Sequence, residues 1–199
     1  MEQREKSVSP FSNKNRNAYV LEHLTDSLLA LLADKPINDI SISELCDAAG
    51  VGRTSFYRNF ETKEDILKAH ITFLFHGWMD ELAKNPGLPL DRVVYQVFSH
   101  LEGNRDFYGL LYKRGLTYLL KDILLDLCGF NPEQDVVSAY SSAYVAFFLY
   151  GWIEVWLRRG MRETAAELAG YLKTAASGSA SIPPPAPPDS PSDPPWRSG

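Results

Sequence analysis

The stretch from Ser41 to Phe60 constrains the fold most, because it predicts two short helices joined by a tight turn. Ser41 is placed to cap the first helix, and Glu44, three residues later, can complete a capping box. Apolar residues then recur at the spacing of one helical face, namely Ile42, Leu45, Cys46 and Ala49. Gly50 follows as the left-handed residue that ends a helix. The pattern predicts a helix–turn–helix unit.

The second helix of this unit carries more polar groups than a protein core needs. Phe56 and Phe60, four residues apart, predict its buried side. The remaining faces carry hydroxyl and guanidinium groups from Arg53, Thr54, Ser55, Tyr57 and Arg58. Such groups suit phosphates and base edges, so the sequence predicts a recognition helix for the major groove of DNA.

Residues 48–67 resemble the signature of the TetR/AcrR family of bacterial transcriptional regulators, with the sequence AAGVGRTSFYRNFETKEDIL. The resemblance extends from about residue 17 to about residue 70. It implies a helix-turn-helix head that a long helix joins to a helical regulatory body. Many members of the family have histidine where this chain has Asn59. The asparagine side chain can donate to a phosphate, but it carries no charge.

Two body segments, residues 104–111 and 151–164, resemble a subgroup of the family more loosely. That subgroup includes regulators of dihydroxyacetone-kinase-type operons, and the resemblance fixes no ligand.

The DNA contacts are predicted to come from both helices of the unit and from the start of the next one. Arg53 is the first choice for a bidentate guanine contact, and Arg58 is the second. Lys63 is expected to hold a phosphate beside a helix start, and Tyr57 is either a backbone contact or a core residue next to Phe56. The full predicted set is Ser41, Ser43, Arg53, Thr54, Ser55, Tyr57, Arg58, Asn59 and Lys63.

The rest of the chain predicts an all-α fold. A first helix is expected from Asn17 to Ala33, and Thr62 with Asp65 predicts the capped start of a long fourth helix that runs towards Leu82. Body helices are expected at 91–102, 104–113, 115–127, 132–159 and 163–176, with Asn104 and Asn131 as N-caps. The predicted domains are a flexible arm (1–15), a DNA-binding head (16–70), a regulatory and dimerisation body (71–176) and a disordered proline-rich tail (177–199).

The helix expected at 132–159 has two apolar stripes, whereas a helix in a small bundle needs one. Burial inside a larger body is one explanation, and contact with a second copy of the chain is the favoured one. The following helix would complete a four-helix interface between two subunits. The predicted interface residues are Phe148, Trp152, Trp156, Leu168 and Leu172.

Aromatic residues are dense in the body, and the family resemblance implies a ligand pocket there. Each aromatic side chain taken alone is better explained by core packing. Tyrosine hydroxyls on helix faces nevertheless suit an apolar cavity with a few polar groups. The predicted lining of a site for a small apolar ligand is Phe73, Tyr108, Tyr112, Tyr140 and Tyr144.

Composition excludes several other classes of protein. The net charge of −5 argues against indiscriminate nucleic-acid binding. Cys46 and Cys128 have no metal-ligand spacing, and no pattern predicts a metal, a cofactor or an enzyme's nucleophile–base pair. The N-terminus lacks the apolar region of a signal peptide, and the apolar run from Ala143 to Leu157 is shorter than a membrane span. A soluble, cytoplasmic protein is expected.

Together these patterns predict a homodimeric transcriptional regulator, by preference a repressor, that binds a palindromic operator in double-stranded DNA. A ligand or a partner protein at the body would change its operator affinity. The alternative is a helix-turn-helix module that contacts proteins and needs no small ligand.

Overall fold

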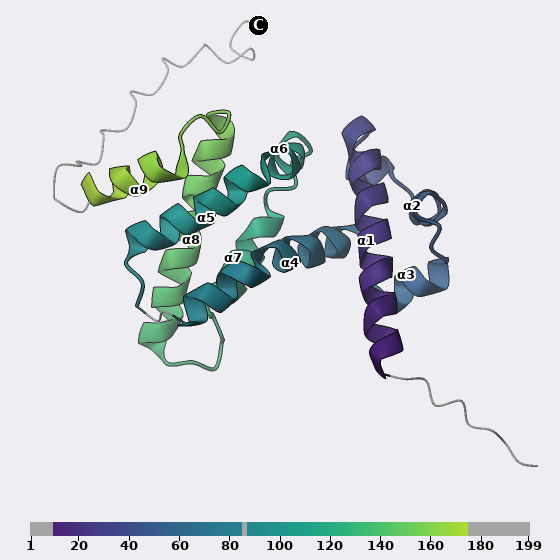
Figure 1. The fold of residues 1–199 in the computed structure, drawn as a ribbon, viewed down its shortest axis with the longest axis horizontal. Coiled ribbons are helices and arrows are strands. Elements are labelled where there is room, and N and C mark those ends of the chain that lie inside the picture. The colour runs from purple at the N-terminus through teal and green to yellow at the C-terminus, as the bar shows by residue number, and fades with distance from the viewer. Residues whose placement is uncertain (1–9, 85–86, 175–199) are drawn as a thin grey trace, which may run out of the picture.

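A computed structural model describes residues 10–84 and 87–174, with side chains described from 18 to 76 and from 87 to 174. Within these ranges the chain forms helices and no strand, which confirms the predicted all-α fold. Figure 1 shows a small head at one end and a larger body at the other, with α4 running between them. The predicted disordered tail (177–199) lies outside the described residues.

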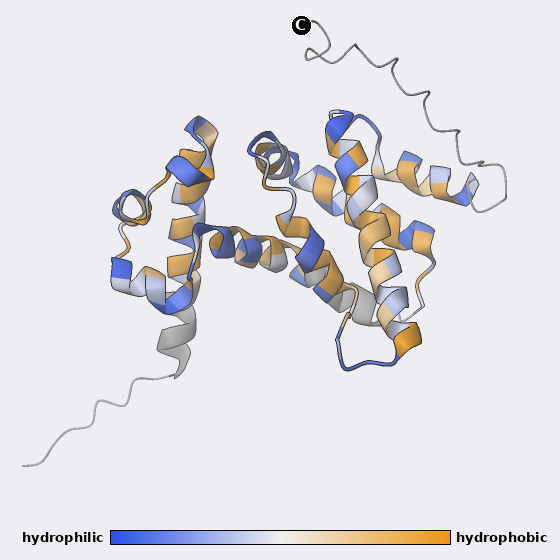
Figure 2. Cartoon of the chain, turned by 180° about the vertical axis from the view of Figure 1, so that it is seen from behind, coloured by the Kyte–Doolittle hydropathy of each residue, from blue (hydrophilic) through white to orange (hydrophobic). Residues whose placement is uncertain are grey.

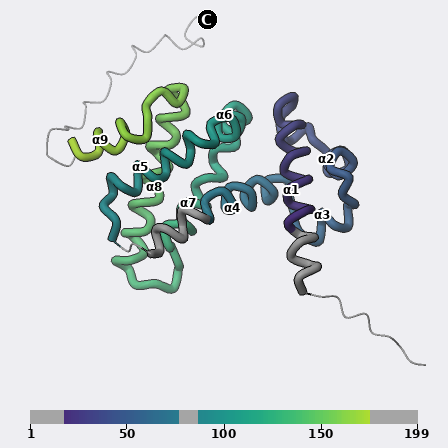
Figure 3. Tube along the Cα trace, viewed as in Figure 1, coloured from purple at the N-terminus to yellow at the C-terminus, as the bar shows by residue number. Residues whose placement is uncertain are grey.

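The head is built from the first four elements of the chain. They are α1 (Pro10–Asp34), the 3₁₀ helix η1 (Ile37–Asp39), α2 (Ile42–Ala49) and α3 (Arg53–Asn59). Leu24 and Leu28 of α1 are fully buried with Leu45 of α2 and Phe56 of α3. This shared core fixes α2 and α3 against one side of α1, as the trace in Figure 3 shows.

The first helix begins earlier than the sequence predicted. It starts at Pro10, whereas the sequence predicted a flexible arm up to residue 15 and a helix start at Asn17. Proline is tolerated in the first turn of a helix, where its missing N–H group would have no partner. The predicted N-terminal arm therefore overlaps α1 in residues 10–15, and its residues 1–9 lie outside the described part of the chain.

Helix α4 (Lys63–Lys84) belongs to both parts of the molecule. Its start is a reciprocal capping box: the Asp65 N–H donates to Thr62 Oγ1 at 3.2 Å, and the Thr62 N–H donates to Asp65 Oδ2 at 2.8 Å. Ile66 and Ile71 are fully buried, and the helix packs on α1 in the head and on α7 in the body. This packing confirms the long connecting helix expected from the sequence.

The body contains five helices after α4. They are α5 (Leu90–Gly103), α6 (Arg105–Lys113), α7 (Leu119–Leu127), α8 (Val136–Arg158) and α9 (Ala165–Thr174). Helix α5 packs along α9, and α7 packs along α8. Phe98, Leu120 and Ile153 are buried where these pairs meet. Figure 2 shows that apolar residues continue along α8 beyond this core.

Two of the predicted helix starts in the body are wrong. Helix α8 starts at Val136 and is capped by Asp135, whose Oδ1 accepts the Ser138 N–H at 3.1 Å. Asn131, the predicted cap, instead accepts the Glu133 N–H within a short turn. Helix α7 starts at Leu119 and not at Gly115, because Gly115 has a φ of 70° that no right-handed helix can contain.

Candidate nucleic-acid interface

The turn between α2 and α3 has the geometry that the sequence predicted. Ser41 Oγ accepts the Glu44 N–H at 3.1 Å and so caps α2. Gly50 ends that helix in the left-handed region, with φ 62° and ψ 26°. The Val51 N–H then donates to the Cys46 carbonyl at 3.0 Å, and α3 begins at Arg53. Local capping and one glycine thus set the direction in which α3 leaves the turn.

The Glu44 carboxylate does not close the predicted capping box. It accepts hydrogen bonds from Lys35 Nζ at 2.7 and 2.8 Å, which tie α2 to the residue after α1. The hydrogen bond from Lys35 is the main cause of the lowered pKa of Glu44. Lys35 thus takes the place of the local backbone partner of Glu44, and its hydrogen bonds link α2 to the end of α1.

Gly50 offers a direct test of the turn. The space around an added Cβ atom is open, with nothing within 4 Å, so the cost of Gly50→Ala is backbone strain alone. We expect a loss of about 1–2 kcal/mol in the free energy of unfolding, measured in urea. Gly103→Ala is the matched control, since its Cβ also meets nothing within 4 Å and its φ is not positive. Equal stability of the two variants would contradict this reading of the turn.

Helix α3 buries one side and presents the other. Phe56 is fully buried and Phe60 is half-buried, as the sequence predicted. Arg53, Thr54 and Arg58 are exposed. Tyr57 is 60% exposed, which excludes a core position, although its ring meets Phe56 edge-on at 5.1 Å. The outer face of α3 is therefore polar and accessible, as a recognition helix requires.

The two arginines of α3 differ in their surroundings. Arg53 Nη1 lies 3.4 Å from Ser43 Oγ, so the first turns of α2 and α3 share one surface. Ser43 on α2 and Ser41, the N-cap of α2, are both exposed. Arg58 lies in the last turn of α3 and has no hydrogen bond or ion pair to any other described residue. Both guanidinium groups are accessible to a ligand.

Two predicted DNA contacts have structural partners inside the head. Asn59 Nδ2 donates to the Ser55 carbonyl at 2.7 Å within α3, and Ser55 itself is half-buried. Lys63 Nζ donates to the carbonyls of Ile37 and Ile40 at 2.5 Å each, which fastens the start of α4 to the loop before α2. An ammonium group has three N–H donors, so one donor of Lys63 stays available. The partners of Lys63 are more than 20 residues away, and no sequence pattern reveals them.

The residues predicted to line a ligand pocket do not gather in the body. Tyr108 is fully buried, and its hydroxyl is 3.0 Å from His100 Nε2; burial raises the pKa of Tyr108 and lowers that of His100. Phe73 is exposed on α4, while Tyr140 and Tyr144 lie on the outer face of α8. Tyr112 is also exposed. Tyr140 and Tyr144 line one pocket on α8, and none of the other three predicted residues is in its lining, so the ligand site stays a prediction.

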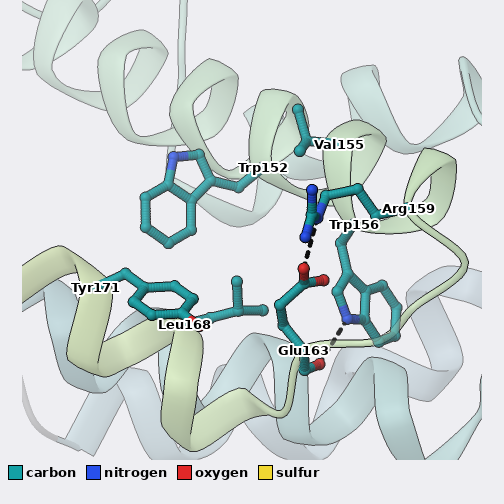
Figure 4. Close-up of a pocket in the computed structure, with 7 residues that line it drawn as sticks. All are labelled: Trp152, Val155, Trp156, Arg159, Glu163, Leu168 and Tyr171. Carbon is teal, nitrogen blue, oxygen red and sulfur yellow. Dashed lines mark hydrogen bonds and ion pairs between the residues drawn. The ribbon is translucent and has the colours of Figure 1, made fainter. Parts of the chain in front are cut away.

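Two of the predicted interface residues belong to the core of the subunit. Trp156 is only 1% exposed, and its indole N–H donates to the Glu163 carbonyl at 2.8 Å (Figure 4). Leu168 is buried beside it. Phe148, Trp152 and Leu172 are half-buried at the edge of an exposed surface. The prediction for Trp156 and Leu168 is corrected, since both are covered within one chain.

Helix α8 carries an exposed apolar face, which we call the α8 face. Its residues are Val136, Val137, Tyr140, Tyr144, Phe147 and Val155. Tyr144 stacks towards Phe148 (ring centroids 6.4 Å apart), and Phe148 continues to Trp152 (4.9 Å). Only 17% of the apolar window of α8 is buried inside the described part of the chain. An apolar face of α8, with residues from both predicted stripes, is thus left uncovered within one chain.

Helix α8 also has the length and composition of a helix that could cross a membrane, with a mean hydropathy of 1.4. The sequence prediction judged the apolar run too short because it counted only Ala143 to Leu157, whereas the helix has 23 residues. The buried core helix of a soluble protein passes the same test, so this property alone is weak evidence for a membrane.

A cavity of about 460 Å³ lies between α8 and α9 near the end of the α8 face (Figure 4). Its lining is Trp152, Val155, Trp156, Arg159, Glu163, Leu168 and Tyr171. Arg159 Nε donates to Glu163 Oε1 at 2.5 Å, and this hydrogen bond is the main cause of the lowered pKa of Glu163. The cavity is apolar with one ion pair at its wall, and it contains none of the five side chains predicted for a ligand site.

Comparison with known proteins relates the head to a family. The family described as bacterial regulatory proteins, tetR family, matches residues 24–70. The chain is 27% identical over 135 residues to the uncharacterized HTH-type transcriptional regulator YxbF of Bacillus subtilis (strain 168). That match covers 60% of this chain and 36% of YxbF, so the chain spans little more than a third of this relative.

Solved structures share the fold over most of the chain. Lin0861 from Listeria innocua matches with a TM-score of 0.65 at 14% identity, over 88% of this chain and 96% of that one. The fatty acid degradation regulator FadR from Bacillus halodurans gives 0.50 at 15%, over 87% and 98%. FadR from Bacillus subtilis, solved in complex with stearoyl-CoA, gives 0.50 at 16%, over 79% and 98%.

These similarities agree with a helix-turn-helix head on a helical body, and with a regulator rather than an enzyme. The likeness of the body to dihydroxyacetone-kinase-operon regulators stays a prediction. Residues 24–70 of this chain, which hold the helix-turn-helix head, are thus similar to the tetR family of bacterial regulatory proteins.

Proposed function

We propose that the protein is a homodimeric transcriptional repressor that reads a palindromic operator with two copies of α3. The observation that carries this proposal is the exposed polar face of α3 on a head that matches the TetR family. Arg53 would contact a guanine, and Arg58 would contact a second base or a phosphate. Ser41, Ser43 and Tyr57 would hold phosphates beside them, with Thr54 facing the groove. Such a repressor works in the cytoplasm.

The α8 face supports the dimer. Large exposed apolar surfaces on a protein mark places that a partner covers. A second copy is the occupant that the proposed function requires, because one α3 reads one half-site and a palindrome needs two. In a twofold interface the same face of both subunits meets itself, so one apolar strip suffices for both. The revised interface consists of the α8 face together with Phe148, Trp152 and Leu172.

Regulation by a small apolar ligand or by a partner protein at the body completes the proposal. The FadR structure with stearoyl-CoA supports it only by analogy of fold, because that ligand is bound by another protein at 16% identity. A ligand can change DNA affinity only if it binds one arrangement of the two heads more tightly than another. The alternative function, a helix-turn-helix module for protein contacts, differs in one property that can be measured, namely salt-dependent DNA binding.

Binding to DNA from upstream of the protein's own gene, followed by fluorescence anisotropy between 50 and 300 mM KCl, tests the function. Each phosphate neutralised by a cation contributes a slope of about −0.9 to a plot of log K against log salt. The predicted contact residues Arg53, Arg58 and Lys63 supply three cations per subunit. We therefore expect a slope of about −5 or shallower for the dimer.

A steeper slope would assign further phosphate contacts to other cations, such as Lys14 and Arg16 near the start of α1. Binding of the same strength to unrelated DNA, or no binding at 50 mM KCl, would refute the operator and favour the protein-contact module. A control duplex of equal length and scrambled sequence separates specific from general binding.

A further inference from the structure

One side chain of the body holds the end of the first helix of the head. Arg114, the residue after α6, donates from Nε to the Leu32 carbonyl at 2.5 Å and from Nη2 to the Ala33 carbonyl at 2.7 Å. The partners are 82 and 81 residues away in the sequence. Helix α4 is the covalent connection between head and body, so Arg114 provides a second, independent attachment.

The attachment suits the chemistry of a helix end. The last carbonyls of α1 have no partners within the helix and carry the negative end of its dipole. A guanidinium group is planar and presents its N–H donors in a fixed fork, so it fixes the direction of its partners as well as their distance. A lysine at the same place would offer a point charge without that directional control.

Arg114 is held rigidly on the body side. The Gly115 N–H donates to the Tyr112 carbonyl at 3.0 Å, and the Leu116 N–H donates to the Leu111 carbonyl at 2.8 Å, which closes the end of α6. Leu111 and Leu116 are buried in the body core. The backbone that carries the guanidinium group therefore cannot move without disturbing the core.

A series of contacts connects the end of α1, which Arg114 holds, to the recognition helix α3. The residue after α1, Lys35, is hydrogen-bonded to Glu44 on α2, and α2 fixes α3 through the Gly50 turn. Next to this route, the ring of Phe107 on α6 meets His70 on α4 edge-on, with centroids 5.0 Å apart. Helix α6 thus contacts both α1 and α4 where the head joins the body.

We infer that Arg114 is a positioning residue that fixes the orientation of each head on its body and thereby sets the half-site spacing that the dimer reads. The spacing part of this inference rests on the proposed function. The orientation part does not, because it concerns the arrangement within one chain. Without Arg114 the head stays attached through α4, but it loses the directional contact at the end of α1.

The orientation is tested first, without DNA. Spin labels at Asp47→Cys on α2 and Asp126→Cys on α7, both exposed positions, report the head-to-body distance by double electron–electron resonance. Cys46 and Cys128 are replaced by alanine, and labelled chains are diluted with unlabelled ones so that distances within one chain dominate. We expect a narrow distance distribution that broadens at least twofold in Arg114→Ala, and an intermediate width in Arg114→Lys. Lys113→Ala, an exposed neighbour on α6, is the control and keeps the narrow distribution.

The spacing is tested on operators whose half-sites are moved closer or apart by one and two base pairs. Wild type and Lys113→Ala should lose at least tenfold in affinity for a shift of one base pair, and Arg114→Ala no more than threefold. Affinity for an isolated half-site should be equal in all three proteins.

An unchanged distance distribution in Arg114→Ala overturns the inference whatever the DNA data show. A broadened distribution with wild-type spacing preference overturns its spacing part, and equal loss at every spacing and at the half-site assigns Arg114 a merely structural role. Absence of DNA binding by the wild type refutes the proposed function and leaves the orientation result standing.

Discussion

Replacing Arg53 by alanine is expected to weaken operator binding at least 30-fold at 100 mM salt. A bidentate arginine–guanine pair contributes about 1–3 kcal/mol of discrimination, and a dimer makes the contact twice, so the loss is about 2–6 kcal/mol. Arg53 is exposed at the first turn of α3, and its one described partner is the long contact to Ser43, so the variant leaves the head intact. Fluorescence anisotropy with operator and scrambled duplexes measures the effect.

A matched control separates base reading from simple loss of charge. Arg92→Ala removes the same charge from an exposed position on α5 in the body, and it should change operator affinity less than twofold. Arg53→Lys keeps the charge but loses the bidentate geometry, so it should retain binding to the scrambled duplex while losing preference for the operator. Equal effects of Arg53→Ala and Arg92→Ala would refute the assignment of α3 as the recognition helix.

The helix-turn-helix head could be predicted in detail because its signals are local. Ser41 caps the helix that starts one residue later, Gly50 ends it, and Phe56 is buried where the pattern placed it. Each of these outcomes depends on backbone conformation and on neighbours within a few residues. The predicted starts of α1 and α8 were wrong, because several neighbouring residues compete to begin a helix at each place. Helix α1 begins at Pro10, and α8 is capped by Asp135.

The roles of three side chains could not be predicted, because each depends on a partner that no local sequence pattern reveals. The sequence predicted Trp156 in the dimer interface, but the Glu163 carbonyl accepts its indole N–H inside the subunit. No sequence pattern distinguishes Arg114 from the other arginines, and its role follows only from the end of α1 that lies next to it in the structure. Lys63 was assigned to a phosphate by its place at a helix start, although two carbonyls of the loop before α2 hold it.

Replacing Tyr144 by glutamate is expected to convert the dimer into monomers at 10 µM protein in sedimentation velocity. Tyr144 is 66% exposed within its own subunit, so the substitution disturbs no core of that subunit, and far-ultraviolet circular dichroism should stay unchanged. In the proposed interface the twofold axis places two new carboxylates in one apolar contact, where neither has a partner. Burying unpaired charge costs several kcal/mol per group, enough to raise the dimer dissociation constant by more than 100-fold. Affinity for the palindromic operator should fall to that of an isolated half-site.

Tyr95→Glu on α5 is the matched control, because Tyr95 is exposed but is not one of the residues of the α8 face. It should remain a dimer with full operator affinity. A dimeric Tyr144→Glu would place the interface on another surface. Wild-type protein that is monomeric and floats with liposomes in a density gradient, with Tyr144→Glu remaining in solution, would show that lipid covers the α8 face instead. The dimer predicts the opposite pair of results, since a face already covered by a second subunit has no apolar surface left for a membrane.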